Sequence, residues 1–161
     1  MQAEKIFIEA IEQNQPIIHK VCNLYMNNEQ DRKDLFQEIL LSAWKGFVNF
    51  KGDAKFSTWL YRVALNTAIT FYRKDQRKLP TASLPEQFVM SSDNPGNEEQ
   101  VKAMYSSINH LSPIDKALVM LYMEDYVYSE IGEMMGITAN NVAVKMNRIK
   151  LKLKENAKKY L

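Results

Sequence analysis

Positively charged side chains are concentrated in the C-terminal part of the chain. Seven Lys or Arg residues lie between Lys145 and Lys159, and Glu155 is the single acid among them. Such a density of positive charge suits contact with phosphates, which dominate the affinity of proteins for nucleic acids. This segment is therefore the first candidate for a binding surface, and the neighbouring elements must hold it in place.

The residues around this basic segment predict two helices joined by a tight turn. Gly136 interrupts an apolar-periodic run and can end a helix in a left-handed conformation, after which Thr138 can cap the next helix. The second helix has an apolar face with spacings of four, three and four, formed by Val142, Met146, Ile149 and Leu153. A cationic second helix is typical of a helix-turn-helix that binds the DNA major groove. The alternative is a helical hairpin with a solvated, lysine-rich face.

A second basic zone lies in the middle of the chain. Residues 51–78 carry seven cations and two acids, and residues 128–161 carry seven cations and three acids. Residues 79–127 between them carry two cations and seven acids. Two basic zones separated by an acidic segment indicate two contacts with a polyanion rather than one.

Composition indicates a helical protein of a reducing compartment. The chain has 161 residues, five Gly and five Pro, and it lacks the alternating pattern of strands. The single cysteine, Cys22, excludes an internal disulfide framework. The N-terminal residues do not form a secretory signal, and no segment approaches the roughly 18 apolar residues of a membrane span. We therefore expect a cytoplasmic protein without membrane insertion.

Proline and small polar residues divide the chain in two. Residues 79–97 hold three of the five prolines, two acids and no cation, which is the composition of a linker. The predicted fold is all-α, with two small helical domains at residues 1–79 and 98–161 and a flexible linker at residues 80–97.

In the second domain, Ser112 and Pro113 are expected to start a helix, and Tyr122 is expected to belong to the core.

Helical periodicity in the first domain predicts a break near Pro16 and two amphipathic helices after it. The first begins near residue 31 and places Trp44 on its apolar side. The second follows a loop at Gly52. Its expected inward side consists of Trp59, Leu60, Val63, Ala64, Thr67, Ala68 and Phe71. Its expected outer stripe consists of Arg62, Asn66, Thr70 and Arg73.

Two long segments together resemble a known family. They are "DLFQEILLSAWKGFVNFKGDAKFSTWLYRVALNTAITFYRK" in the first domain and "LSPIDKALVMLYMEDYVYSEIGEMMGITANNVAVKMNRIKLKL" in the second. They resemble the extracytoplasmic-function (ECF) sigma factors, a subfamily of the sigma-70 type factors of bacterial RNA polymerase. The resemblance implies a transcription initiation factor that binds core RNA polymerase, directs it to specific promoters and helps to open the DNA. The two domains would correspond to sigma regions 2 and 4.

The resemblance implies two interfaces in the first domain. The residues expected to face the polymerase are Asp34, Gln37, Glu38 and Leu41. The residues expected to hold the single strand of the minus-ten element are Lys51, Lys55, Arg62, Asn66, Arg73 and Lys74, with Arg77 and Lys78 as further phosphate contacts. Trp44 and Trp59 lie on apolar helix sides, and we therefore do not expect them to stack on bases.

In the second domain, the resemblance implies recognition of the duplex minus-thirty-five element. The residues expected at this interface are Thr138, Asn140, Asn141, Ala143, Val144, Lys145, Asn147 and Arg148. Asn can pair with adenine, Arg with guanine, and Ala or Val can touch a thymine methyl group. Lys145, Lys150 and Lys152 are expected near phosphates.

Two other classes of function compete with this interpretation. An enzyme would need a catalytic or metal-binding cluster, but His19 and Cys22 have no further His or Cys nearby. We therefore expect no catalytic residues, no metal and no cofactor. A stand-alone helix-turn-helix regulator would bind DNA without becoming a polymerase subunit. An anti-sigma factor is a further partner that the resemblance suggests.

Overall fold

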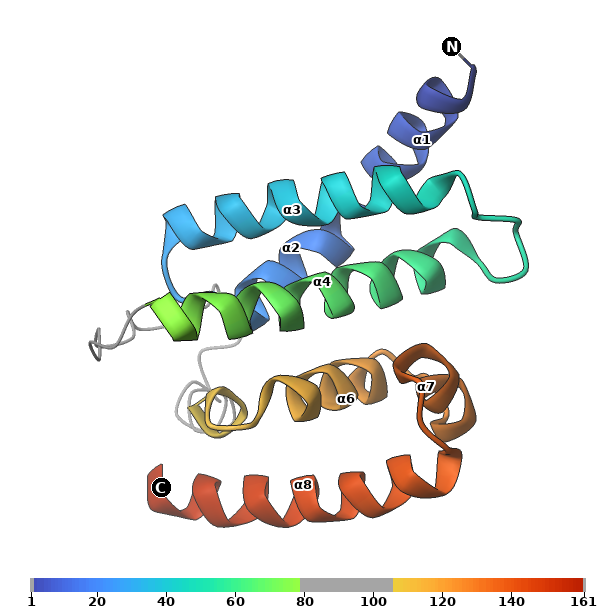
Figure 1. The fold of residues 1–161 in the computed structure, drawn as a ribbon. Helices are drawn as coiled ribbons and strands as arrows, with labels where there is room; N and C mark the ends of the chain where they lie inside the picture. The colour runs from blue at the N-terminus through green and yellow to red at the C-terminus, as the bar shows by residue number, and fades with distance from the viewer. Residues whose placement is uncertain (1, 79–105, 161) are drawn as a thin grey trace. The chain divides into compact units, whose positions relative to one another are not determined.

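The computed structural model describes residues 2–78 and 106–160, and Figure 1 shows their arrangement. The described residues form α-helices and no strand, which confirms the all-α prediction. The helices are α1 (Gln2–Gln13), α2 (Gln15–Tyr25), α3 (Glu29–Phe47), α4 (Phe56–Lys78), α6 (Pro113–Met123), α7 (Tyr128–Met135) and α8 (Ala139–Tyr160). Residues 106–109 are also helical.

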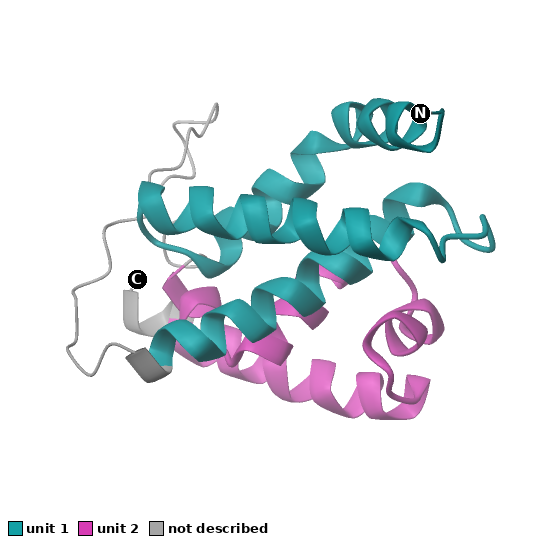
Figure 2. Ribbon diagram, turned by 45° about the horizontal axis from the view of Figure 1, so that its top comes forward, with its two compact units in different colours: residues 1–86 teal, residues 87–161 magenta. Residues whose placement is uncertain are grey.

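The chain divides into two compact units, residues 1–86 and residues 87–161 (Figure 2). The first contains α1 to α4 and the second contains α6 to α8. The predicted linker at residues 80–97 lies outside the described residues. The linker and the exact domain boundaries therefore stay predictions.

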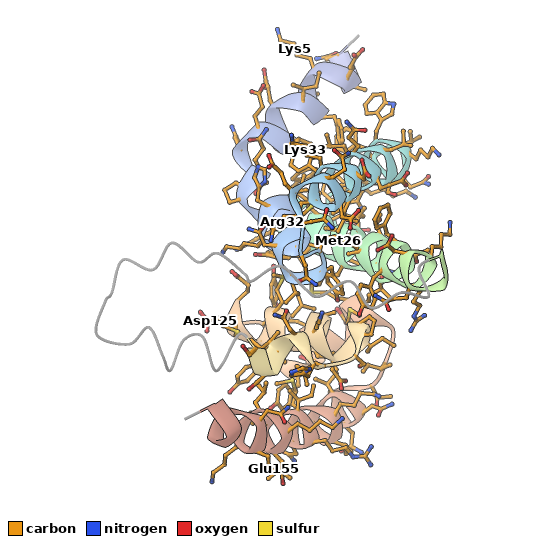
Figure 3. The ribbon with its side chains drawn as sticks, turned by 90° about the vertical axis from the view of Figure 1, so that its left-hand side faces the viewer. Lys5, Met26, Arg32, Lys33, Asp125 and Glu155 are labelled. Atoms are coloured by element: carbon orange, nitrogen blue, oxygen red, sulfur yellow. The ribbon has the colours of Figure 1, made fainter. Side chains whose placement is uncertain are left out.

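The N-terminal helices break where the sequence predicts. Asn14 separates α1 from α2, and Pro16 lies in the first turn of α2, where the missing N–H of proline does not cost a helical hydrogen bond. α3 begins after Asn28, whose side-chain oxygen accepts a hydrogen bond from the N–H of Asp31 at 2.8 Å. The Nε of Arg32 donates to the carbonyl oxygen of Met26 at 3.1 Å and closes the turn between α2 and α3 (Figure 3).

α3 and α4 run side by side, and both pack on α2. The fully buried side chains of this unit include Ile18, Val21, Leu35, Ile39, Leu60 and Leu65. Four aromatic rings gather where α3 connects to α4, with centroids 5.2 to 6.3 Å apart; Phe47 ends α3, Phe50 lies in the connecting loop, and Phe56 and Trp59 lie at the start of α4. This cluster anchors both ends of the loop of residues 48–55.

The buried face of α4 differs from the predicted one. Tyr61, Leu65 and Ile69 are buried, whereas Val63 and Phe71 are only half-buried. The reason is that α4 contacts both α2 and α3, so two adjoining sides of the helix are covered. A prediction based on a single apolar arc is centred on one side and misses the other.

The second unit is built around α8. Ser112 accepts a hydrogen bond from the N–H of Asp115 at 3.2 Å, and Pro113 is the first residue of α6, which confirms the predicted start of that helix. Side chains from all three helices are fully buried in this unit: Leu118, Leu121, Ile131, Val142, Met146 and Ile149. The expectation that Tyr122 is a core residue is wrong, since 42% of its surface is exposed.

Candidate nucleic-acid interface

The turn between α7 and α8 fixes the position of the predicted recognition helix. Gly136 has a φ of 74° and ends α7 in the left-handed conformation, as predicted. Its neighbour in the fold, Gly132, lies so close to the turn that a Cβ there would be 2.5 Å from the carbonyl oxygen of Ile137. The absence of side chains at these two positions lets α7 end directly against the start of α8.

The first turn of α8 is capped by Thr138. Its hydroxyl oxygen accepts a hydrogen bond from the N–H of Asn141 at 3.1 Å. The predicted cap is therefore confirmed, and one of the four unpaired N–H groups of the helix start is satisfied. This bond makes Thr138 a residue that orients the helix, whatever else it contacts.

The predicted duplex-binding residues lie mainly on the exposed side of α8. The opposite side, formed by Val142, Met146 and Ile149, is buried. Ala143 and Lys145 are half-buried and mark the two borders between these sides. The exposed residues of the predicted set are Thr138, Asn140, Asn141, Val144, Asn147 and Arg148. Amide and guanidinium groups, which are able to bond base edges, are thus exposed together on this helix, and their contact with DNA stays a prediction.

Leu151 is a residue that sequence reasoning missed on this side of α8. Its surface is 64% exposed, and it follows Val144 by seven residues, which places both on the same side of the helix. The spacing alone could have identified it. A single exposed leucine is common on protein surfaces. Leu151 matters here because it lies on the same side of α8 as the exposed polar residues of the predicted set.

Lys150 lies at the flank of α8 and interacts within its own unit. Its Nζ is 4.8 Å from the centroid of the Tyr122 ring, and that ring lies 6.2 Å from the ring of Tyr128. Hydrogen bonding to Tyr122, and then to Tyr128, raises the pKa of Lys150. The predicted contact of this lysine with a phosphate stays a prediction.

The outer stripe of α4 is exposed as predicted. Arg62, Asn66, Thr70 and Arg73 all face solvent, and Lys74 is exposed beside them. The hydroxyl of Thr70 donates to the carbonyl oxygen of Asn66 at 3.1 Å. Together these groups provide positive charge and an amide along more than three turns of one helix.

The loop before α4 adds two further cations. Lys51 and Lys55 are exposed on either side of Gly52, whose φ of 78° requires the conformational freedom of glycine. The side chains of Arg77 and Lys78, also predicted to contact phosphates, lie outside those that the structure describes. The described cations of this zone therefore extend from the loop along α4.

The two tryptophans are packed against other rings. Trp59 is half-buried within the aromatic cluster of the α3–α4 connection. The centroid of Trp44 is 5.1 Å from that of Phe7 in α1, although 39% of the Trp44 surface is exposed. Both rings thus have structural partners, and the expectation that neither stacks on bases stays a prediction.

The predicted polymerase-binding residues share the polar side of α3. Asp34, Gln37, Glu38 and Leu41 are all exposed, and Leu41 presents 49% of its surface. Gln30 donates from Nε2 to Oδ1 of Asp34 at 3.0 Å, one turn away. Leu41 is thus an exposed apolar side chain on an otherwise polar side of α3, and its contact with polymerase stays a prediction.

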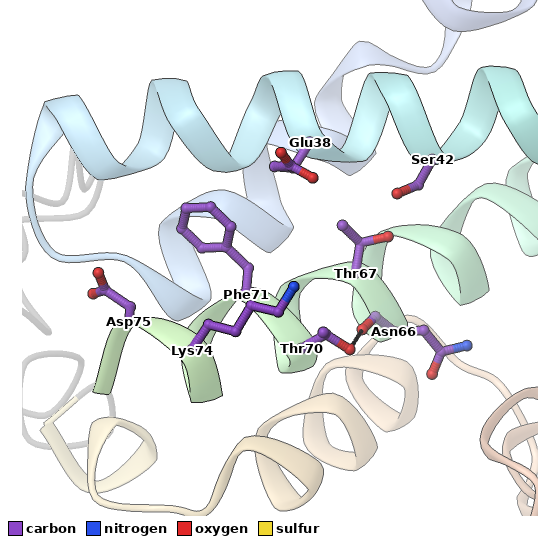
Figure 4. A pocket seen from close by; sticks show the side chains of 8 residues that line it. All are labelled: Glu38, Ser42, Asn66, Thr67, Thr70, Phe71, Lys74 and Asp75. Carbon is purple, nitrogen blue, oxygen red and sulfur yellow. Dashed lines mark hydrogen bonds between the residues drawn. The ribbon is translucent and has the colours of Figure 1, made fainter. Parts of the chain in front are cut away.

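A groove of about 520 Å³ separates this polar side of α3 from α4 (Figure 4). Its lining residues are Glu38, Ser42, Asn66, Thr67, Thr70, Phe71, Lys74 and Asp75. Three of them, Glu38, Asn66 and Lys74, belong to the predicted sites. Sequence reasoning could not find the groove, because it depends on how two helices pack.

The rejected enzyme-like pair has ordinary structural surroundings. The His19 ring lies 5.0 Å from the ring of Phe36. Cys22 is buried, and burial raises the pKa of its thiol to about 12, opposite to the low pKa of a nucleophilic cysteine. No helix among the described residues combines the length and apolar character needed to cross a membrane.

Comparison with known proteins assigns both units to one family. Residues 10–78 match the family model of sigma-70 region 2, and residues 102–153 match that of sigma-70 region 4. The ECF sigma factor SigG of Mycobacterium tuberculosis is 32% identical, over 62% of this chain and 34% of its own. The chain thus spans about a third of the length of that relative. SigM of the same organism is 26% identical, over 84% of this chain and 69% of its own.

A solved structure has the same fold. The sigma factor RpoE from Bartonella quintana, crystallised with the anti-sigma factor NepR, matches with a TM-score of 0.78. The match covers 96% of this chain and 98% of the RpoE chain, at 16% sequence identity. With both units matched to sigma regions and several ECF factors among its relatives, this chain belongs to the ECF subfamily of the sigma-70 type RNA polymerase sigma factors.

Proposed function

We propose that the protein is a transcription initiation factor that binds core RNA polymerase, directs it to specific promoters and helps to open the DNA. The observation that carries this proposal is the match of each compact unit to a different sigma region. A stand-alone helix-turn-helix regulator would account for the second unit only. The protein would act in the cytoplasm by binding, without catalysis of its own.

The second unit would read the duplex minus-thirty-five element. α8 would enter the major groove, where Asn140, Asn141, Asn147 and Arg148 can reach base edges. Val144 could touch a thymine methyl group. Exposure of these side chains opposite the buried face of α8 supports the assignment.

The first unit would hold the single strand of the minus-ten element. Taking a base out of the stack costs a few kcal/mol, which contacts to the separated strand must offset. The cations of the 48–55 loop and of α4 would bind phosphates, and Asn66 would contact a base. This role is supported by the exposure of these side chains, which lie in the loop and along one side of α4.

The polar side of α3 would attach the protein to core polymerase through Asp34, Gln37, Glu38 and Leu41. This surface lies on a different helix from the outer stripe of α4, so both partners could bind at once. An anti-sigma factor is a further proposed partner, because the exposed polymerase surface is the natural target of an inhibitor. The likeness to RpoE in a complex with NepR is in keeping with this.

Reconstituted transcription tests the proposal. Fragmented genomic DNA is transcribed by bacterial core polymerase with and without the purified protein, and the transcripts are sequenced. We expect new start sites that share two upstream elements. Binding of the protein to duplex DNA with no change in the transcripts would instead identify a stand-alone regulator.

A further inference from the structure

The groove between α3 and α4 joins the two proposed interfaces of the first unit. Glu38 and Ser42 project from α3 towards α4, and Asn66, Thr70 and Lys74 come from α4 (Figure 4). Glu38 belongs to the proposed polymerase surface, whereas Asn66 and Lys74 belong to the proposed strand surface. A single groove of about 520 Å³ is thus bordered by residues of both.

The charges that line this groove have opposite effects on a DNA strand. The ammonium group of Lys74 attracts a phosphate, and the carboxylate of Glu38 on the facing helix repels it. Glu38 and Lys74 line the same groove, and charges in a groove between two helices are screened less than charges in open solvent. A strand that reaches Lys74 therefore also meets the field of Glu38.

Glu38 is the groove acid that polymerase can reach. It is exposed on α3, one turn from Asp34 and Leu41, which belong to the same proposed surface. The second groove acid, Asp75, lies on α4, is half-buried and has interactions within the protein. A polymerase donor that binds the Glu38 carboxylate would neutralise the charge in the groove.

We propose that Glu38 is a charge gate for the strand-binding site, an inference that rests on the proposed function. In the free chain its carboxylate lowers the affinity of the first unit for single-stranded DNA. Docking to polymerase engages the carboxylate and removes this repulsion. Binding of polymerase and binding of the strand are then coupled, and such coupling is reciprocal. A bound strand therefore raises the affinity of the protein for polymerase by the same factor.

The gate can be tested on the full chain without polymerase. The dissociation constant of a short, fluorescently labelled single-stranded oligonucleotide is measured for the wild type, for Glu38→Gln and for Glu9→Gln. Glu9 is exposed on α1 and does not line the groove, so the control makes the same change in net charge elsewhere in the unit. Glutamine is nearly isosteric with glutamate and preserves the helix.

We expect Glu38→Gln to tighten binding about 5-fold at low salt, a coupling at the lower end of the usual range. Glu9→Gln should change binding less than about 1.5-fold, because its charge is more fully screened. The difference between the two variants should shrink as salt rises. Equal tightening by both variants, or none by Glu38→Gln, would overturn the gate.

Lys74→Ala separates this proposal from the function on which it rests. When Lys74→Ala is added to Glu38→Gln, most of the increase in affinity for the oligonucleotide should be lost, since the Glu38 carboxylate is proposed to repel a strand that is bound at Lys74. If Lys74→Ala leaves the gain intact, the gate as described is wrong. Promoter-specific transcription in the reconstituted assay would still stand in that case, because that assay does not depend on how the free chain binds DNA.

Discussion

The turn of the helix-turn-helix closes directly onto Gly132. The N–H of Ile137 donates to the carbonyl oxygen of Gly132 at 2.9 Å, and a Cβ on Gly132 would lie 2.5 Å from the carbonyl oxygen of Ile137. The obstacle is backbone, which cannot rotate away as a side chain can. The angle between α7 and α8 therefore depends on glycine at this position.

Gly132→Ala should destabilise the second unit by about 1 to 3 kcal/mol, the usual cost of overpacking, although alanine is the better helix former. Thermal unfolding followed by circular dichroism measures the change. Gly46→Ala is the matched control, because its Cβ would meet only a side-chain atom, Cζ2 of Trp59, at 3.3 Å. Equal stability of the two variants would show that the contact at Gly132 is easily relieved.

Thr138→Ala should cost about 1 kcal/mol of stability, the usual value for loss of an N-cap, even in the absence of DNA. Thr138→Ser should retain most of that stability, because serine supplies the same acceptor to the N–H of Asn141. Chemical denaturation of the free protein measures both. Full stability of the alanine variant would mean that water replaces the cap and that Thr138 acts only at the DNA.

Arg148→Ala should weaken binding to duplex promoter DNA by about 1 to 3 kcal/mol, the usual contribution of a base-contacting arginine. Binding to core polymerase should be unchanged, because Arg148 lies in the other compact unit from the polymerase surface. Fluorescence anisotropy and polymerase co-elution measure the two affinities. Lys33→Ala, an exposed α3 lysine that pairs with Glu29 at 3.4 Å, controls for loss of charge.

The double variant Gln37→Ala with Leu41→Ala should weaken binding to core polymerase and leave binding to duplex DNA unchanged, which is the reverse of the effect expected for Arg148→Ala. Both residues are exposed on α3, so the fold should tolerate their truncation. Polymerase binding should fall about 10-fold or more, since an apolar contact and an amide would be lost from the proposed interface. Duplex binding by the isolated protein should stay constant. Parallel loss of both activities would indicate misfolding or a wrong assignment of the α3 surface.

Cys22 provides a pH-dependent test of the first unit. Burial raises the pKa of its thiol from the ordinary value of 9.0 to about 12. The unfolded chain therefore releases this proton first as pH rises above 9.0, which favours unfolding. The stability of the wild type should fall towards pH 12 more steeply than that of Cys22→Ala. Parallel curves from denaturant titrations would show that the thiol is not buried in solution.

Features set by neighbouring residues could be predicted from the sequence. Ser112 and Thr138 cap their helices, and Gly136 ends α7, because each acts within one helical turn. The exposed side of α8 follows in the same way from the spacing of its apolar residues. Periodicity within one helix therefore identified the exposed sides that carry the candidate interfaces.

Features that depend on packing between helices could not be predicted. Tyr122 has the periodicity of a core residue, but its ring lies at the surface beside Lys150 and Tyr128. The buried face of α4 is wider than its apolar arc because two helices cover it. The groove beside Glu38 exists only where α3 and α4 come together.

The central claim is that the two units contact different parts of one promoter while attached to polymerase. Photo-crosslinking from positions 66 and 147 of the protein, in a complex with core polymerase and promoter DNA, tests it most directly. We predict that position 147 crosslinks to duplex DNA near the minus-thirty-five element and position 66 to the non-template strand near the minus-ten element, only when polymerase is present. Crosslinks from both positions to one duplex segment, or the same pattern without polymerase, would contradict it.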